Sequence, residues 1–476
     1  MRRPIPKLVA SLALASTLLA GCALEPAYHR PAPPVPAQWP AGPAYVAPAD
    51  VTVADWREVF LDSKLQAVIS QALANSRDLR VAIAQIQASR AQYHIQRADL
   101  LPKINAQAGM STGRDYTGLP PILGGAYQNA TTYSTSVGTT AYELDLFGRV
   151  RSLTKSALEA YLATEEAKRS TQISLVAEVA SDYLTYAADA SLLQVSKATV
   201  TSAQSNFDLA RRRLEGGIAS QLDVSSAETI LDQAQDDVAR YTTQVAQDKN
   251  ALDLVVGAAV APENLPTGVD DPATRLGEAP DALNSNVLLR RPDVREAEHT
   301  LRGANANIGA ARAAFFPSIS LTASGGTQSA SLSNLFSRGA GVWSFAPTVT
   351  LPIFAGGANL ANLDYAKAQD RIDVAQYEKA IQTAFREVAD ALAQRGTITE
   401  RLRAQRAQVA AAAQSLRLAE ALYKRGSDSY LDVLTAQRTL YSAQQSQIAV
   451  QLIAQTNTVT LYKVLGGGVS DRGKAG

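Results

Sequence analysis

Residues 216–227 read GGIASQLDVSSA, and residues 425–436 read RGSDSYLDVLTA. These two stretches decide the fold. Each has a glycine-containing turn followed by a Ser-x-x-Asp pattern, which is typical of a helix N-terminus. Each also lies between two long segments in which apolar residues recur at spacings of three and four, the pattern of coiled-coil helices. We therefore expect two long helical hairpins whose tips are these two turns.

The arms of both hairpins carry an apolar residue at every seventh position. This set comprises Val179, Tyr186, Leu193, Val200, Phe207 and Leu214 in one arm, and Leu402, Val409, Leu416 and Tyr423 in the other. A helix of roughly 65 residues is roughly 100 Å long at 1.5 Å per residue. An ordinary globular domain has no room for such a helix, so the pattern predicts elongated coiled-coil arms.

Further landmarks recur outside the hairpins in the same order, which indicates a duplicated domain. The matching blocks are RDLRVA (77–82) with PDVREA (292–297), ADLLPKINAQAG (98–109) with AAFFPSISLTAS (313–324), and ELDLFG (143–148) with TLPIFA (350–355). Pro102 falls on Pro317 without a gap, and Gly257 corresponds to Gly466. In each copy an amphipathic helix, about 63–100 or 285–314, ends shortly before the matching proline.

Each copy also contains two runs that we expect to be strands. They are 104–114 with 131–147 in the first copy, and 318–326 with 342–354 in the second. In the last run Trp343, Phe345, Val349 and Leu351 share one parity, and small or polar residues occupy the other, which is the period of a strand. About ten residues is the length that a tilted strand needs to cross a bilayer.

Four strands cannot close a membrane barrel alone, because the smallest barrels need about eight. An open sheet leaves backbone groups unpaired in lipid, which costs several kcal/mol for each group. The chain is therefore expected to assemble with copies of itself. Two copies give eight strands and an interior filled by side chains, whereas three copies give twelve strands and a bore. The residues alone leave this choice open.

The N-terminus, MRRPIPKLVASLALASTLLAGCALEP (1–26), is typical of an export signal. Its apolar core is too short to span a bilayer, and the sequence Leu19-Ala20-Gly21-Cys22 resembles the bacterial lipobox. Cys22 is the only cysteine, so no internal disulfide forms. We expect Cys22 to be acylated after cleavage before it; the alternative is an ordinary signal peptide followed by a stray cysteine. The proline-rich run 26–48 is interpreted as an extended strap.

Composition argues against several function classes. A net charge of +1 gives no indication of a nucleic-acid partner. The three histidines, His29, His94 and His299, do not cluster, which argues against a multi-histidine metal or catalytic site. The sequence has no nucleophile–base set and no phosphate loop, so we expect neither an enzyme nor a cofactor. Beyond the N-terminus no run of 18 apolar residues occurs, which argues against a helical membrane span.

Three stretches carry a resemblance to a known family. They are YELDLFGRVRS (142–152), RRPDVREAEHTLRGANANIGAARAAFFPSISLT (290–322) and YLDVLTAQRTLYSAQ (430–444). They resemble signatures of the TolC-like outer-membrane efflux proteins, in particular the lipoprotein (NodT-type) branch that serves resistance-nodulation-division pumps. The resemblance implies an α+β membrane protein that forms a homotrimer. Each chain would give four β-strands to a twelve-stranded outer-membrane barrel, and long helices would form a coiled-coil tunnel through the periplasm.

The resemblance also implies partners and a function. The partners would be a periplasmic adaptor (membrane fusion) protein, an inner-membrane pump and the outer-membrane lipid. The chain would be a passive exit duct for drugs or other toxic small molecules. Heavy-metal efflux or type I protein secretion through the same fold remains an alternative, and so does a lipid-anchored coiled-coil scaffold without a pore.

The same resemblance implies that residues at the hairpin tips hold the periplasmic end shut. The candidates are Asp223, Tyr423, Asp428 and Asp432. The alternative for the aspartates is helix capping, because Ser220-x-x-Asp223 and Ser429-x-x-Asp432 both have the form of a capping box. For Tyr423, the heptad position equally favours packing.

The predicted organisation is as follows. We expect a lipoprotein signal peptide (1–21), a lipid-anchored extended strap (22–62), a first-repeat helix (63–103), two barrel strands (104–147), a long hairpin (148–257), a linker (258–284), a second-repeat helix (285–317), two further strands (318–354), a second hairpin (355–465) and a C-terminal tail (466–476).

Overall fold

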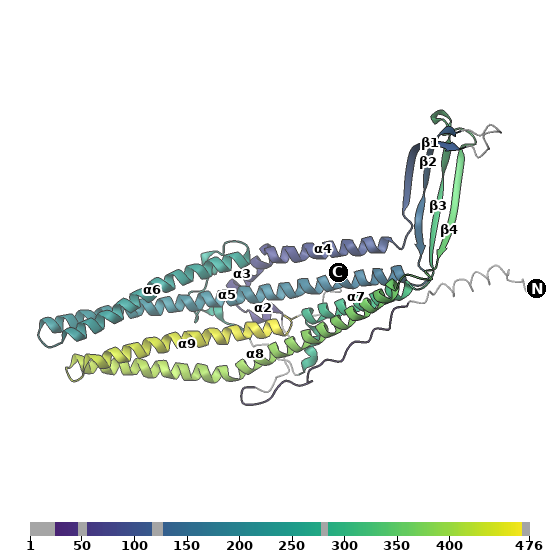
Figure 1. Cartoon of the computed structure of the whole chain (residues 1–476). Helices are drawn as coiled ribbons and strands as arrows, with labels where there is room; N and C mark the ends of the chain where they lie inside the picture. Colours follow the sequence, from purple (N-terminus) through teal and green to yellow (C-terminus); the bar gives the residue numbers. More distant parts are fainter. Residues whose placement is uncertain (1–23, 46–54, 117–126, 278–283, 469–476) are drawn as a thin grey trace, which may run out of the picture. The chain divides into compact units, whose positions relative to one another are not determined.

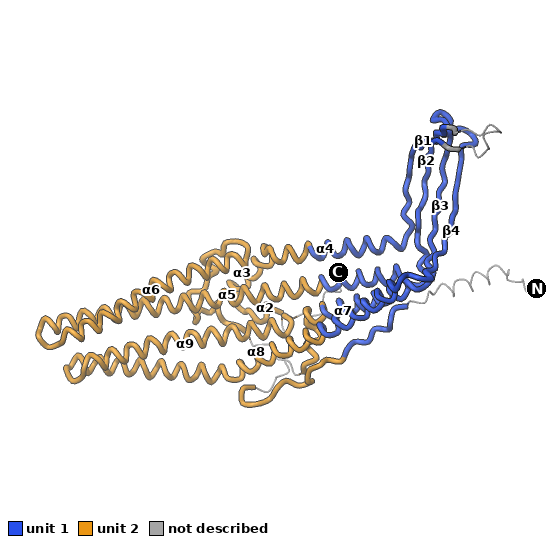
Figure 2. Tube along the Cα trace, in the orientation of Figure 1, with its two compact units in different colours: residues 1–31, 85–164, 297–377 blue, residues 32–84, 165–296, 378–476 orange. Residues whose placement is uncertain are grey.

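The computed structural model describes residues 24–45, 55–116, 127–277 and 284–468. The chain forms two compact units, and each unit draws on both repeats (Figure 2). Unit 1 comprises residues 1–31, 85–164 and 297–377, and unit 2 comprises residues 32–84, 165–296 and 378–476. Cys22 and the signal peptide lie outside the described residues, as does part of the C-terminal tail.

Unit 1 contains a single four-stranded antiparallel sheet in the order β1-β2-β3-β4 (Figure 1). The strands are β1 (Ile104–Tyr116), β2 (Tyr127–Leu144), β3 (Ser318–Ser329) and β4 (Gly341–Thr350). β2 of the first repeat pairs with β3 of the second, with Leu144 opposite Ile319 and Tyr133 opposite Ser329. The four predicted strands are confirmed, and β1 and β4 are the two edges of the sheet within the chain.

Two strands end earlier than predicted. β2 stops at Leu144 rather than at residue 147, because the next residue begins a helix cap: Asp145 accepts hydrogen bonds from the backbone N–H groups of Val150 and Arg151 at 3.1 and 2.8 Å. β4 stops at Thr350 rather than at residue 354. Pro352 follows, and proline has no N–H group with which to continue a strand ladder.

The apolar residues that alternate with small or polar ones along β4 are exposed in the single chain. Trp343, Phe345 and Val349 share one parity and are 82%, 61% and 64% exposed. Burying a large apolar side chain stabilises a fold by about 1.5–3 kcal/mol. Because a single chain leaves this row bare, the surroundings that bury it lie outside the chain.

Six helices make up most of the chain. They are α4 (Arg77–Ala98), α5 (Arg149–Glu215), α6 (Gln221–Val256), α7 (Pro292–Ala313), α8 (Ala358–Lys424) and α9 (Tyr430–Val464). α5 and α8 have 67 residues each, which agrees with the long arms predicted from the heptads. In unit 2, α6 returns beside α5 and α9 returns beside α8 (Figure 1). No helix among the described residues is both long and apolar enough to cross a membrane.

The continuous helix predicted over 63–100 is wrong. It breaks at Ser76, whose extended backbone (ψ 131°) separates α3 (Ser63–Asn75) from α4. The second repeat breaks at the corresponding residue, Arg291 (ψ 137°), between a short 3₁₀-helix, η4 (Ser285–Arg290), and α7. There the cause is Pro292, which disfavours helical backbone in the residue before it. In the first repeat the Ser76 hydroxyl accepts a hydrogen bond from the Leu79 N–H at 3.4 Å and so starts a new helix.

The main core of unit 2 also uses segments that we expected to be strap or linker. Trp56, Val59 and Phe60 are buried, and the first two lie in the short helix α2 (Trp56–Val59). Phe60 bridges to Leu276 of the expected linker and packs edge-on against Tyr462 at 5.6 Å between ring centroids. The linker holds two 3₁₀-helices, η2 (Pro262–Asn264) and η3 (Pro272–Thr274). These apolar contacts stabilise the base of both hairpins.

Candidate functional site

The first hairpin tip forms the capping box that the sequence predicts. The α5 helix ends at Glu215, and Gly217 takes a left-handed backbone (φ 73°) that favours glycine. The Asp223 N–H donates to the Ser220 hydroxyl at 3.2 Å, and the Ser220 N–H donates to the Asp223 carboxylate at 2.9 Å. Asp223 therefore caps α6.

The second tip does not form the same box, so the capping prediction is wrong there. Ser429 makes no side-chain cap bond; its hydroxyl instead donates to the Asp432 carboxylate at 2.5 Å. The Ser429 N–H donates to Asp428 at 2.9 Å, so this competing carboxylate takes the donor that Asp432 would use in a box. Hydrogen bonding with Ser429, and then with Asp428, lowers the pKa of Asp432.

Tyr423 is buried at the junction of the two tips. Its ring lies 5.3 Å from that of Tyr430, and the Arg213 guanidinium of the other hairpin lies 4.2 Å above it. Arg213 also donates to the Tyr423 carbonyl at 2.8 Å. Ala210 and Val224 complete the apolar cluster, so this cluster joins α5 and α6 to α8 and α9.

The Tyr423 hydroxyl is buried and has no hydrogen-bond partner among the described residues. Burial raises the pKa of Tyr423, and burial also raises the pKa of Tyr430 to about 12. Both rings therefore stay neutral and act by packing. The structure brings Tyr423 near Asp223, whose charge contributes to both shifts, whereas Asp428 and Asp432 bond to Ser429. Sequence reasoning missed Arg213 and Tyr430, which adjoin the heptad and turn positions that it had singled out.

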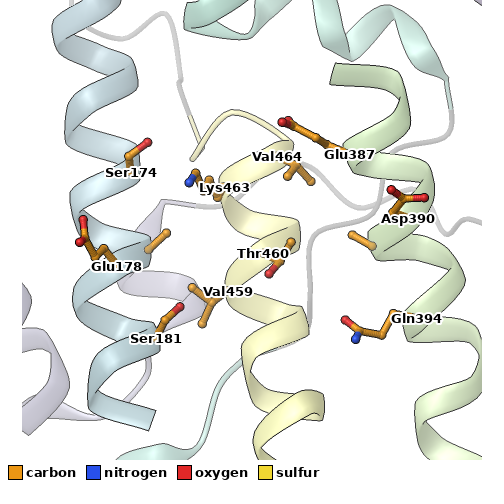
Figure 3. Close-up of a pocket in the computed structure, with 12 residues that line it drawn as sticks. Ser174, Glu178, Ser181, Glu387, Asp390, Gln394, Val459, Thr460, Lys463 and Val464 are labelled. Atoms are coloured by element: carbon orange, nitrogen blue, oxygen red, sulfur yellow. The ribbon is translucent and has the colours of Figure 1, made fainter. Parts of the chain in front are cut away.

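A cavity of about 660 Å³ lies among α5, α8 and α9 in unit 2 (Figure 3). Three carboxylates line it, those of Glu178, Glu387 and Asp390, together with the Lys463 amine. Glu387 forms an ion pair with buried Arg291 at 2.8 Å, and Arg291 also donates to the carbonyl of Val464. Glu387 therefore has a structural partner, and Glu178 and Asp390 give the cavity an acidic wall that favours cations.

The first described residues of the chain dock onto unit 1. Glu25 pairs with Lys155 at 2.6 Å, and the Leu24 carbonyl accepts a hydrogen bond from Arg312 at 3.1 Å. Arg312 lies in the last turn of α7, shortly before β3 begins at Ser318. The start of the described chain is therefore held next to the sheet end of this unit.

Nothing in the described residues suggests a resident metal or catalytic centre. They contain no group of three or more His, Cys, Asp or Glu side chains placed to hold a metal ion. The half-buried His299 contacts Glu159 at 2.7 Å, and this pair joins α7 to α5 as a packing contact.

Comparisons with known proteins match nearly the whole chain. The family model described as "Outer membrane efflux protein" matches residues 68–258 and 283–467, so one match falls on each repeat. The antibiotic efflux pump outer membrane protein ArpC of Pseudomonas putida is 50% identical over 97% of this chain and 96% of that protein. The toluene efflux pump outer membrane protein TtgC, also of Pseudomonas putida, is 49% identical with the same coverage. The open-state MtrE outer membrane channel of Neisseria gonorrhoeae has a TM-score of 0.84 at 36% identity, covering 94% of this chain and 98% of that chain.

Proposed function

The chain belongs to the outer membrane efflux protein family, and we propose that it is the exit duct of a tripartite pump for toxic organic small molecules. The duct is an outer-membrane channel without chemistry of its own. Energy comes from an inner-membrane pump of the resistance-nodulation-division type, and a periplasmic adaptor links the two. The relatives named for antibiotic and toluene efflux support organic cargo.

One observation carries this proposal: the sheet has two open edges and an uncovered apolar row. β1 and β4 pair only with β2 and β3 in the chain, and Trp343 on β4 is 82% exposed. Open edges are not tolerated in lipid, because no water is present to satisfy their backbone groups. Three copies join these edges into a twelve-stranded barrel with a bore. A scaffold without a pore does not require a sheet with open edges and an exposed apolar row.

The homotrimer presents six similar hairpin tips, two from each chain. Leu222 and Leu431 occupy matching positions in the two tips and are 74% and 65% exposed. Apolar side chains bare on a loop-to-helix turn are suited to contact with another protein. The tips are therefore the surface for the periplasmic adaptor.

Tyr423, Asp223, Asp428 and Asp432 act as the periplasmic gate in this proposal. Tyr423 links the two hairpins of one chain through Arg213 and packs against Tyr430 of its own hairpin, so its cluster resists separation of the tips. Asp428 and Asp432 are exposed on the second tip. Threefold copies of such acids near an axis favour cations.

The lipid attachment at Cys22 is also proposed. Cys22 is two residues before Leu24, and a chain segment of two residues spans at most about 7 Å. Leu24 and Glu25, the first described residues, are held by Arg312 and Lys155 at the sheet end of unit 1. That is where a molecule with this sheet in the membrane meets the lipid surface.

The proposal is tested with purified full-length protein in planar bilayers and with a deletion strain. We expect stepwise conductance from heat-resistant trimers. We also expect that the deletion strain loses tolerance to toluene and to a hydrophobic antibiotic, and that the intact gene restores it. Well-assembled trimers that conduct no ions would contradict a duct. Conducting trimers whose loss leaves both tolerances unchanged would contradict the cargo class alone.

A further inference from the structure

One buried carboxylate oxygen in the first hairpin lacks a donor. Oδ1 of Asp248, on α6, accepts a hydrogen bond from the Gln244 amide at 3.0 Å. Its other oxygen, Oδ2, is shielded from solvent and has no hydrogen-bond partner among the described residues. On α5 the side chain of Asp189, which is also an acid, lies within hydrogen-bonding reach of Asp248. Two ionised carboxylates at such a distance repel each other, so a proton on one of them removes the repulsion.

The nearby cations are already engaged elsewhere. Arg240 pairs with Asp237 at 2.5 Å and covers the Tyr241 ring. Lys249 pairs with Asp253 at 2.6 Å. The remaining groups that face Asp248 come from α5: they are the carboxyl group of Asp182 and the phenol of Tyr186. The charge of Glu178 acts on Asp182. The surroundings therefore supply negative charge and no uncommitted cation, within the described residues, that could replace the proton.

The charge of this cluster changes near neutral pH. Burial, followed by hydrogen bonding with Asp248 and the charge of Asp248, raises the pKa of Asp189 to about 7. Burial, followed by the charges of Glu178 and Asp248, raises the pKa of Asp182 to about 6. A small change in periplasmic pH thus alters the number of negative charges held between α5 and α6.

We propose that Asp189 and Asp248 share one proton and form a pH-sensitive latch between the two arms of the first hairpin. With the proton present, the two carboxyl groups hydrogen bond and hold α5 against α6. When the proton leaves, two anions face each other beside further acids, and the arms separate more readily. The latch belongs to the chain itself and does not depend on the identity of the cargo.

The sign of the pH effect follows from proton binding. In an unfolded chain aspartate loses its proton near its ordinary pKa of 3.8, whereas in the folded hairpin Asp189 keeps it up to about pH 7. The folded state therefore binds the extra proton between about pH 4 and pH 7. The stability of the α5–α6 contact falls as the pH rises through this window, and it becomes constant above it.

Hydrogen exchange on the full-length trimer in detergent tests the latch. Amides of residues 182–195 and 242–252 are followed at pH 5 and pH 8, after correction for the intrinsic pH dependence of exchange. We expect their opening constant to rise at least about tenfold in the unmodified protein. In Asp189→Asn the amide donates at every pH, so the rise should shrink to the smaller part that Asp182 contributes near pH 6. Asp236→Asn, which removes an exposed carboxylate from α6, should keep the whole rise.

An infrared difference spectrum between pH 5 and pH 8 gives a direct readout of the shared proton. The band of a protonated carboxyl group should be lost in a step with a midpoint near pH 7. This step should be absent from Asp189→Asn, in which only the loss from Asp182, with a midpoint near pH 6, remains. Asp248→Asn provides the same comparison if the first variant does not assemble. An unchanged pH dependence of exchange in an assembled variant, or no carboxyl band that titrates near neutral pH, would overturn the latch.

Discussion

The substitution Tyr423→Ala removes the buried ring that joins the two hairpin tips. Truncation of a buried large aromatic side chain typically costs about 3–5 kcal/mol. The ring also carries the contact with the Arg213 guanidinium at 4.2 Å and with Tyr430 at 5.3 Å. Since 1.4 kcal/mol is about tenfold in an equilibrium constant, the balance between joined and separated tips shifts by about two to three and a half powers of ten.

The expected result is a leaky duct. Planar-bilayer conductance of Tyr423→Ala trimers should rise, and cells should take up large antibiotics that the unmodified protein excludes. Tyr423→Phe is the matched control, because it keeps the ring and removes only a hydroxyl without a hydrogen-bond partner among the described residues. Conductance and uptake at the unmodified level in fully assembled Tyr423→Ala trimers would refute the role of this cluster in closing the tips.

Four further substitutions have definite outcomes. Ser220→Ala should lower the free energy of unfolding by about 1 kcal/mol, because the helix cap is lost. Ser429→Ala should lower it by clearly less, since Ser429 makes no side-chain cap bond. Equal losses of the two variants in chemical denaturation would contradict the difference between the tips. Glu298 pairs with Arg30 at 2.7 Å and with Arg302 at 2.6 Å. Burial opposes ionisation of Glu298, but these two arginines hold its pKa below the ordinary value, so the stability it contributes is present at neutral pH and is lost as the pH falls through that lowered pKa. Glu298→Gln should therefore destabilise the protein at pH 7 and make its stability less sensitive to acid, as measured by thermal unfolding at neutral and acidic pH. Cys22→Ser should abolish labelling with radioactive palmitate, and persistent labelling would place the acyl chain elsewhere.

The hairpins were predictable because their signals are local. The heptad spacing that includes Val179 and Tyr423 needs only the chain itself, and so do the turn glycines. The last strand followed from its period of two, and the other three followed mainly from their position between helix landmarks. The family matches then agree with the duplicated plan, since one match falls on each repeat.

Other features depended on contacts that the sequence does not display. The early end of β2 results from Asp145 turning to cap α5, and the failed second box results from Asp428 competing for the Ser429 N–H. Residue spacing alone predicts neither of these two hydrogen-bonding arrangements. The contact of Arg213 with Tyr423 joins two hairpins that are far apart in the chain, so periodicity within one helix cannot predict it. The Asp189–Asp248 pair was hidden for the same reason, because its members lie on different helices.

The mass of the folded protein in detergent tests the central claim most directly. Native mass spectrometry, with circular dichroism on the same sample to confirm the sheet, gives the number of chains in the particle. We expect three chains for every folded particle, because the open edges of β1 and β4 must pair with those of other copies and twelve strands, unlike eight, leave a bore. A single chain that keeps its four-stranded sheet in detergent would contradict the account.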